Sequence, residues 1–152
     1  MPRRIYRICR AIHARLDGEG AKLAGGRWNS PGRRVIYMAE TISLAVLENL
    51  VHMAKEDFPA GYVVIAADVP DGIVVTNEED LVKQSPGLDQ RGLGDRWIDL
   101  CASAVLVVRS TIVPFEHNYL LNPQHSDFAA IQVEAAAPFV FDERLFGSKQ
   151  PR

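Results

Sequence analysis

Three segments of the chain, residues 25–32, 37–48 and 109–123, concentrate residue types that bind anions or offset a developing positive charge. Two glycines directly precede Arg27 in the first segment, and Glu48 ends the second. Glycine lets a backbone approach a ligand closely, and the planar guanidinium of arginine binds phosphate or carboxylate oxygens in pairs. These residue types predict an anion site at Arg27 and leave open which of the two anions it holds.

The charge distribution favours a small, locally held anion. The net charge of the 152 residues is −2, but residues 1–34 hold nine Lys and Arg against two acids, while the remainder holds eight against seventeen. A nucleic-acid-binding domain is usually strongly basic, whereas this chain has a pI near 6.1. Arginine outnumbers lysine thirteen to four, which favours bidentate contacts. We therefore expect no direct contact with nucleic acid.

Signatures of several common enzyme classes are missing from the sequence. In the segment G-E-G-A-K-L, Leu23 replaces the third glycine of a dinucleotide-binding fingerprint, and no G-K-[ST] marks a phosphate-binding loop. There is no G-x-S-x-G nucleophile motif, and none of the four histidines stands in H-E-x-x-H. Cys9 and Cys101 are far apart, and we expect two reduced, buried thiols and no metal site.

Hydropathy patterns indicate which elements position these segments. Alternation predicts a strand at 5–9, glycines predict a loop over 18–32, and a second strand follows at 35–39. An apolar stripe at helical spacing predicts a helix from 41 to about 56, which would carry Glu48. Further strands are predicted at 62–69, 73–75, 104–108, 111–113, 131–135 and 138–141, and a further helix at 94–103.

Strands outnumber helices and do not alternate with them regularly, so we expect one α+β domain with mixed, mostly antiparallel β-sheets and flanking helices. The strands at 62–69 and 73–75 are expected to be neighbours near a sheet edge. The domain is expected to span 1–146, with a tail at 147–152. Because no apolar run is long enough to span a bilayer, we expect no membrane partner and a cytoplasmic location.

The polar segments together resemble the RES domain family. The resemblance covers nearly the whole chain, and its motifs are too long to arise by chance. The matching motifs are G-G-R-W-N-x-x-G at 25–32, V-I-Y-x-A at 35–39, S-L-A-x-L-E-x-L-V-H at 43–52 and R-S-x-x-x-P-x-x-x-N-Y-L-L-N-P at 109–123.

The resemblance implies a fold similar to that of ADP-ribosyltransferases and the toxin of a bacterial type II toxin–antitoxin pair. Such toxins consume NAD+, which is then the substrate, so no cofactor is expected. The implied partner is an antitoxin with an Xre-like helix-turn-helix, which would also carry the DNA binding. A homodimer of the toxin is expected within that complex.

The family takes its name from an arginine, a glutamate and a serine, which fall on Arg27, Glu48 and Ser110. The resemblance implies that these three residues are catalytic. Arg27 can bind phosphate oxygens of NAD+, and the Glu48 carboxylate can bind ribose hydroxyls and offset positive charge in an oxocarbenium-like transition state. Ser110 is expected to form a hydrogen bond with the ribose or the carboxamide, because without a paired base it is a poor nucleophile.

Three further residues are expected to complete the substrate pocket. Tyr37 offers a flat aromatic face on which the nicotinamide ring can stack. Arg7 on the first strand and Asn118 in a loop ending at Pro123 are expected at the pocket rim.

The acceptor for the ADP-ribosyl group stays open among water, phosphate and a protein side chain. One alternative function is therefore ADP-ribosyl transfer to a specific protein. Two others are a nucleic-acid-targeting toxin that uses the basic first third of the chain, and a non-enzymatic module with a basic groove. Release of nicotinamide from NAD+ would separate the enzymes from the last two.

Overall fold

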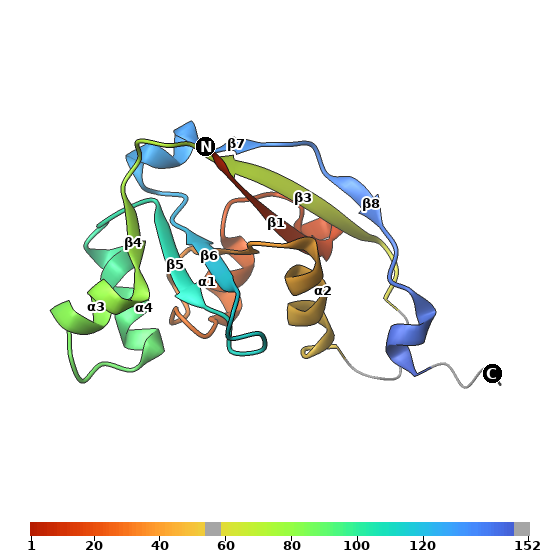
Figure 1. Ribbon diagram of the computed structural model, residues 1–152, viewed down its shortest axis with the longest axis horizontal. Coiled ribbons are helices and arrows are strands. Elements are labelled where there is room, and N and C mark those ends of the chain that lie inside the picture. Colours follow the sequence, from red (N-terminus) through yellow and green to blue (C-terminus); the bar gives the residue numbers. More distant parts are fainter. Residues whose placement is uncertain (54–58, 148–152) are drawn as a thin grey trace.

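The computed structural model describes residues 1–53 and 59–147, and its strands form a single curled sheet (Figure 1). The strands are β1 (Arg3–Arg10), β2 (Ile36–Ala39), β3 (Tyr62–Val69), β4 (Val75–Asn77), β5 (Val105–Arg109), β6 (His117–Leu121), β7 (Gln132–Val133) and β8 (Ala137–Phe139). Their order is β4-β5-β6-β2-β1-β3-β7, with β8 also paired to β3. Every pair is antiparallel except β4 and β5. The predicted α+β class with a mixed, mostly antiparallel sheet is confirmed.

Short helices flank the sheet at both ends. They are α1 (Glu19–Ala24), α2 (Ile42–Leu50), α3 (Glu78–Gln84) and α4 (Gln90–Asp99), with 3-10 turns η1 (Ala11–His13), η2 (Ser126–Ala130) and η3 (Glu143–Phe146). In Figure 1, α2 lies below β1 and β3, while α3 and α4 lie together at the opposite end beside β4 and β5.

The helix that carries Glu48 is fixed by its cap and its buried face. The Thr41 hydroxyl accepts a hydrogen bond from the backbone N of Leu44 at 3.0 Å, which caps α2. Leu44 is fully buried and joins Ile8 of β1 and Phe141 in one apolar cluster. The predicted helix start is confirmed, and packing against β1 holds α2 at a defined place on the sheet.

A second apolar cluster anchors the loop that carries Arg27. Trp28 is 3% exposed and packs in the same cluster as Trp97 of α4 and Leu106 of β5. The loop is therefore held between a helix and the sheet, although it contains two adjacent glycines.

Three regular elements were not predicted from the sequence. The glycine-rich segment 18–32 contains α1, which begins after Gly18 and ends before Gly25, both with φ of 73°. Residues 117–121 form β6 instead of a loop, because this segment pairs with β2 on one side and β5 on the other. The third is α3, capped by the side chain of Asn77.

The strand order also differs from the expectation. Strands predicted at 5–9, 35–39, 62–69 and 104–108 are confirmed as β1, β2, β3 and β5, while those at 131–135 and 138–141 are the shorter β7 and β8. The strand expected at 73–75 is β4, at 75–77, and it is not a neighbour of β3. It pairs in parallel with β5, and α3 and α4 provide the crossover that a parallel pair requires.

Two further expectations were wrong, and the limits of α4 differ. Residues 111–113 form a turn, because two of their backbone N–H groups donate to Ser110 Oγ. The helix expected at 94–103 begins earlier, where the Asp89 side chain accepts a backbone N–H of its first turn. Cys101, expected to be buried, is exposed after the end of α4 with φ of 49°, whereas Cys9 is buried.

Two predictions fall partly beyond the described residues. The helix expected over 41–56 ends at Leu50 and continues as a turn through residue 53, and 54–56 lie outside the described residues. Residues 148–152 of the expected tail also lie outside the described residues. No helix in the described ranges is long and apolar enough to cross a membrane.

Candidate active site

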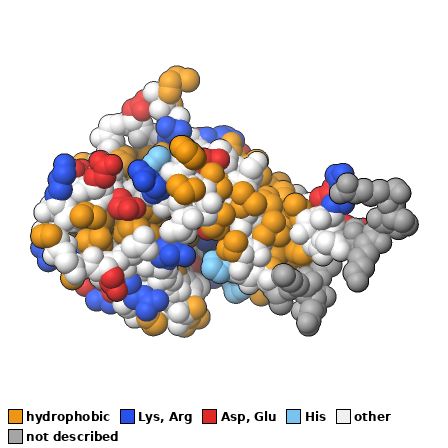
Figure 2. Space-filling view, turned by 60° about the horizontal axis from the view of Figure 1, so that its bottom comes forward, with side chains coloured by type: hydrophobic (Ala, Val, Ile, Leu, Met, Phe, Trp, Pro, Cys, Tyr) orange, Lys and Arg blue, Asp and Glu red, His pale blue; other side chains and the backbone are white. Residues whose placement is uncertain are grey.

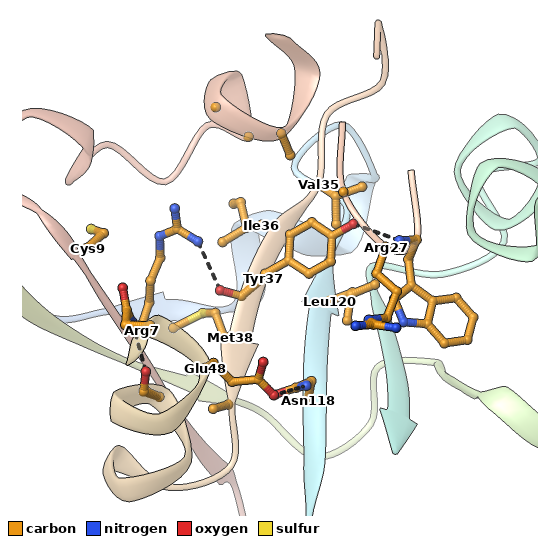
Figure 3. Close-up of a pocket in the computed structure, with 18 of the residues that line it drawn as sticks. Arg7, Cys9, Arg27, Val35, Ile36, Tyr37, Met38, Glu48, Asn118 and Leu120 are labelled. Carbon is orange, nitrogen blue, oxygen red and sulfur yellow. Dashed lines mark hydrogen bonds between the residues drawn. The ribbon is translucent and has the colours of Figure 1, made fainter. Parts of the chain in front are cut away.

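Five of the six predicted site residues line one cleft of about 1450 Å³. Arg7 comes from β1, Arg27 from the loop before β2, Tyr37 from β2, Glu48 from α2 and Asn118 from β6. Figure 3 shows Arg7 and Arg27 on opposite sides of Tyr37, with Glu48 and Asn118 below. Side chains from four secondary-structure elements and a loop therefore meet at one site.

The Glu48 carboxylate is oriented by two neutral donors. Ser110 Oγ donates to Glu48 Oε1 at 3.1 Å, and Asn118 Nδ2 donates to the same oxygen at 2.9 Å. No described residue donates a hydrogen bond to Oε2, which Figure 3 shows turned away from Asn118. One oxygen is thus held by the protein, and the other can accept a hydroxyl of a ligand.

Ser110 supports Glu48 and does not reach the cleft. It is 1% exposed, and its Oγ accepts hydrogen bonds from the backbone N of Ile112 at 3.1 Å and of Val113 at 3.0 Å. Because both amides are donors, the hydroxyl proton points to Glu48. In this structure Ser110 lies behind Glu48 and does not line the cleft, so its hydroxyl orients the carboxylate, and its predicted contact with ribose or carboxamide stays a prediction.

Within residues 1–53 and 59–147, most arginines at the cleft form no ion pair, whereas most arginines elsewhere do. Among the described residues, six arginines have no carboxylate within 4.0 Å, and five of these line the cleft. The five are Arg7, Arg10, Arg27, Arg91 and Arg109. Figure 2 shows basic and histidine side chains beside the hollow on this face. Of the described carboxylates, those of Glu48 and Asp89 also line the cleft without an ion pair, so unpaired cations outnumber unpaired anions there by five to two. This excess of positive charge attracts a ligand of the opposite sign, so the site favours an anion.

The Tyr37 hydroxyl holds the loop that carries Arg27. It donates to Asn29 Oδ1 at 2.6 Å and accepts from the backbone N of Trp28 at 3.1 Å. Burial raises the pKa of Tyr37 to about 12, so the hydroxyl stays protonated and can donate at neutral pH. Asn29 is fully buried and donates to the backbone O of Ala21 at 2.9 Å. Tyr37 therefore has a structural role beside the ring stacking predicted for it.

Tyr37→Phe is expected to destabilise the protein by about 1–3 kcal/mol, because Asn29 Oδ1 and the Trp28 amide would both lose their hydrogen-bond partner inside the fold. Urea unfolding followed by tryptophan fluorescence measures the change. Tyr6→Phe serves as the control, since no described hydrogen bond involves the Tyr6 hydroxyl. Equal stability of the two variants would contradict the role of the Tyr37 hydroxyl.

Helix α4 supports the Arg27 loop in a way that the sequence did not reveal. Asp95 accepts hydrogen bonds from the Ser30 backbone N at 2.8 Å and from Ser30 Oγ at 2.6 Å. Gly94 lies directly against Trp28, where an added Cβ would be 1.7 Å from the Trp28 carbonyl oxygen. The 65 residues between Ser30 and Asp95 leave no local pattern that would relate them.

No group of three or more His, Cys, Asp or Glu suited to hold a metal ion is found within residues 1–53 and 59–147. The groups that the cleft offers to a ligand include its arginines, the Glu48 carboxylate and the aromatic ring of Tyr37.

Comparison with known proteins identifies the family. The model of the RES domain matches residues 4–142. The chain belongs to the RES domain family. The chain is 34% identical to the Toxin Res of Photorhabdus laumondii subsp. laumondii, over 96% of this chain and 99% of the relative. It is 38% identical to the Toxin Res of Pseudomonas putida, over 93% and 99%.

Two further comparisons bear on this RES domain. A relative from Sphingobium sp., named Prs ADP-ribosylating toxin, is 33% identical over 86% of each chain. The crystal structure of the M. tuberculosis MbcT-MbcA toxin-antitoxin complex contains a chain that matches with a TM-score of 0.68 and 18% identity, over 96% of this chain and 87% of that one. This structural likeness shows a shared fold.

The RES domain brings two members of its expected triad into contact and keeps the third apart. Glu48 and Ser110 are joined by a hydrogen bond of 3.1 Å, whereas Arg27 is exposed and lines the cleft from a separate loop. Arg7, held by a hydrogen bond of 3.0 Å from Nη1 to the Tyr37 carbonyl, offers a second cation within the cleft.

Proposed function

We propose that this protein is the toxin of a toxin–antitoxin pair and that it cleaves the nicotinamide–ribose bond of NAD+. The observation that carries the proposal is the Glu48 carboxylate, with Oε1 held by two donors and Oε2 left for a ligand. It lies in a cleft lined by five arginines that have no carboxylate partner among the described residues. The names of the relatives from Photorhabdus and Pseudomonas support the toxin assignment.

The chemical groups of NAD+ match the residues of the cleft. Its diphosphate is a dianion that a guanidinium such as that of Arg27 binds through paired hydrogen bonds. Its nicotinamide ribose offers hydroxyls to Glu48 Oε2. Its nicotinamide ring is flat and positively charged, which suits stacking against Tyr37.

In the proposed reaction the bond between ribose C1′ and the nicotinamide nitrogen breaks, and the electron pair leaves with neutral nicotinamide. Positive charge develops on the ribose, and the negative Glu48 carboxylate stabilises it. Because nicotinamide leaves as a neutral molecule, no general acid is needed. Attack of water on C1′ then yields ADP-ribose and a proton, and attack of phosphate yields the corresponding ADP-ribose phosphate.

A second candidate function is transfer of ADP-ribose to a protein side chain. The relative named Prs ADP-ribosylating toxin favours it, since that chain is 33% identical over 86% of this one. The two functions share the bond that breaks and differ only in the nucleophile that attacks C1′.

Incubation of the purified protein with NAD+ labelled in the adenylate phosphate tests both functions. Chromatography measures free nicotinamide and identifies ADP-ribose or its phosphate, and electrophoresis of a bacterial lysate detects labelled protein. Nicotinamide release without labelled protein is expected. Labelled protein that accounts for all the nicotinamide released would favour the second function, and absence of release would contradict both.

Arg27→Ala is expected to raise KM for NAD+ by about 10- to 100-fold, as for loss of a charge-assisted hydrogen bond. Arg27→Lys is expected to restore little, because a lysine keeps the charge but loses the paired geometry. Steady-state rates of nicotinamide release measure both variants. A lysine variant with the KM of the parent would contradict the bidentate contact.

The expected partner is an antitoxin with an Xre-like helix-turn-helix, bound to a homodimer of the toxin. The excess of unpaired arginines at the cleft supports a partner that inserts an anionic segment there. Such a complex is expected to weaken with added salt and in the presence of NAD+.

A further inference from the structure

A second arginine stands beside Arg27 at the cleft. Arg91, in the first turn of α4, donates from Nε to the backbone O of Gly26 at 3.3 Å. Gly26 directly precedes Arg27 in the chain, so this contact places Arg91 next to the Arg27 loop. Arg91 is exposed and lines the same cleft.

Within residues 1–53 and 59–147, neither arginine forms an ion pair. No carboxylate of the described ranges lies within 4.0 Å of Arg27 or Arg91. Asp95, on the same helix as Arg91, is occupied by hydrogen bonds from Ser30 and lies 3.6 Å from Arg33. Asp89, which also lines the cleft, accepts a hydrogen bond from the backbone N of Gly92 at 2.8 Å and forms no ion pair with either arginine.

The charges of both guanidinium groups affect the Tyr37 hydroxyl, so both groups lie near it. Burial raises the pKa of Tyr37, and the negative charge of Asp95 adds to that increase, whereas the charges of Arg91 and Arg27 each oppose it. Two cations within electrostatic reach of one hydroxyl repel each other. An anion bound between them would relieve that repulsion.

We propose that Arg91 and Arg27 together bind the diphosphate of a nucleotide ligand, one guanidinium from α4 and one from the loop. A diphosphate carries charge on both phosphates and can accept from two separate guanidinium groups, so its chemistry matches a site with two arginines. The identity of the nucleotide as NAD+ rests on the proposed function, whereas the diphosphate site does not require that any bond be cleaved.

Binding of ADP-ribose, measured by isothermal titration calorimetry, tests the proposal. ADP-ribose keeps the diphosphate but has no nicotinamide to lose. Arg91→Gln is expected to raise its Kd about tenfold, the effect of losing one charge-assisted contact at an exposed site. The matched control is Arg96→Gln, because Arg96 is also exposed on α4 and has no ion pair but does not line the cleft. This control is expected to leave Kd within about twofold.

The dependence of Kd on salt distinguishes direct binding of the anion by Arg91 from support of the Arg27 loop by Arg91. If Arg91 binds the anion, the difference in Kd between the parent and Arg91→Gln shrinks as NaCl rises from about 0.05 to about 0.5 M, since charge interactions are screened. If Arg91 only holds the Gly26 carbonyl, the difference persists at high salt and the free variant unfolds at a lower urea concentration. A persistent difference, no effect of Arg91→Gln, or equal effects of Arg91→Gln and Arg96→Gln would overturn the proposal.

The same proteins distinguish this proposal from the proposed function. Binding of ADP-ribose that depends on Arg91, in a protein that releases no nicotinamide from NAD+, would contradict NAD+ cleavage and leave the diphosphate site in place. If Arg91→Gln instead released nicotinamide with the kcat/KM of the parent, this result would contradict the diphosphate site and leave NAD+ cleavage in place.

Discussion

Glu48→Gln is expected to lower kcat for nicotinamide release by about 100- to 1,000-fold, the usual effect of removing one group that stabilises transition-state charge. Glutamine has the same size, and its carbonyl oxygen can still accept the hydrogen bonds that Ser110 and Asn118 donate to Oε1. Only the negative charge beside the developing cation is lost. KM and the free energy of unfolding should therefore stay close to those of the parent, and cells that express the variant should grow normally.

The control for this substitution is Glu79→Gln, because Glu79 is an exposed helical glutamate of α3 that does not line the cleft. It should retain full activity and toxicity. Unchanged kcat in Glu48→Gln would show that Glu48 does not stabilise the transition state. A large fall in stability would show that its charge instead supports the fold.

Gly94→Ala is expected to destabilise the protein by about 3 kcal/mol or more, at the upper end of the effects of overpacking. The added Cβ would be 1.7 Å from the carbonyl oxygen and 2.7 Å from the carbonyl carbon of Trp28. These are backbone atoms, so no side-chain rotation can relieve the clash. Either α4 or the loop must move, and because Trp28 adjoins Arg27, the KM for NAD+ should rise as well. Urea unfolding and nicotinamide release measure the two effects.

Gly20→Ala provides a matched control within α1. No atom lies within 4 Å of the Cβ that this change would add, and alanine is the better helix former. We therefore expect a gain in stability of up to about 1 kcal/mol. If Gly94→Ala were as stable as Gly20→Ala, the close contact between α4 and the loop would not exist in solution.

Elements with a strong local pattern were predictable. The alternation in residues 5–9, the β-branched run at 62–69 and the capped start of α2 at Thr41 are all present in the structure. Elements that form only through pairing with neighbouring strands were not predicted. β6 has few apolar residues before Tyr119 and is a strand because it lies between β2 and β5.

The sequence by itself determined the family and five of the residues that line the candidate site. Motifs around Arg27, Glu48 and Ser110 can be recognised locally, because each is a continuous segment of eight to fifteen residues. The Gly-Gly-Arg segment at Arg27 and the concentration of basic residues in the first third of the chain predicted an anion site there.

Only the tertiary structure decided how these residues are arranged relative to one another. Ser110 is 62 residues from Glu48 in the chain, and in the fold it lies buried behind that carboxylate. Arg91 and Asp95 of α4 reach the Arg27 loop across 65 residues. Periodicity and capping encode contacts within a few residues, whereas contacts of this kind depend on strand order and on how closely Gly94 lets a helix approach a loop, which no local pattern specifies.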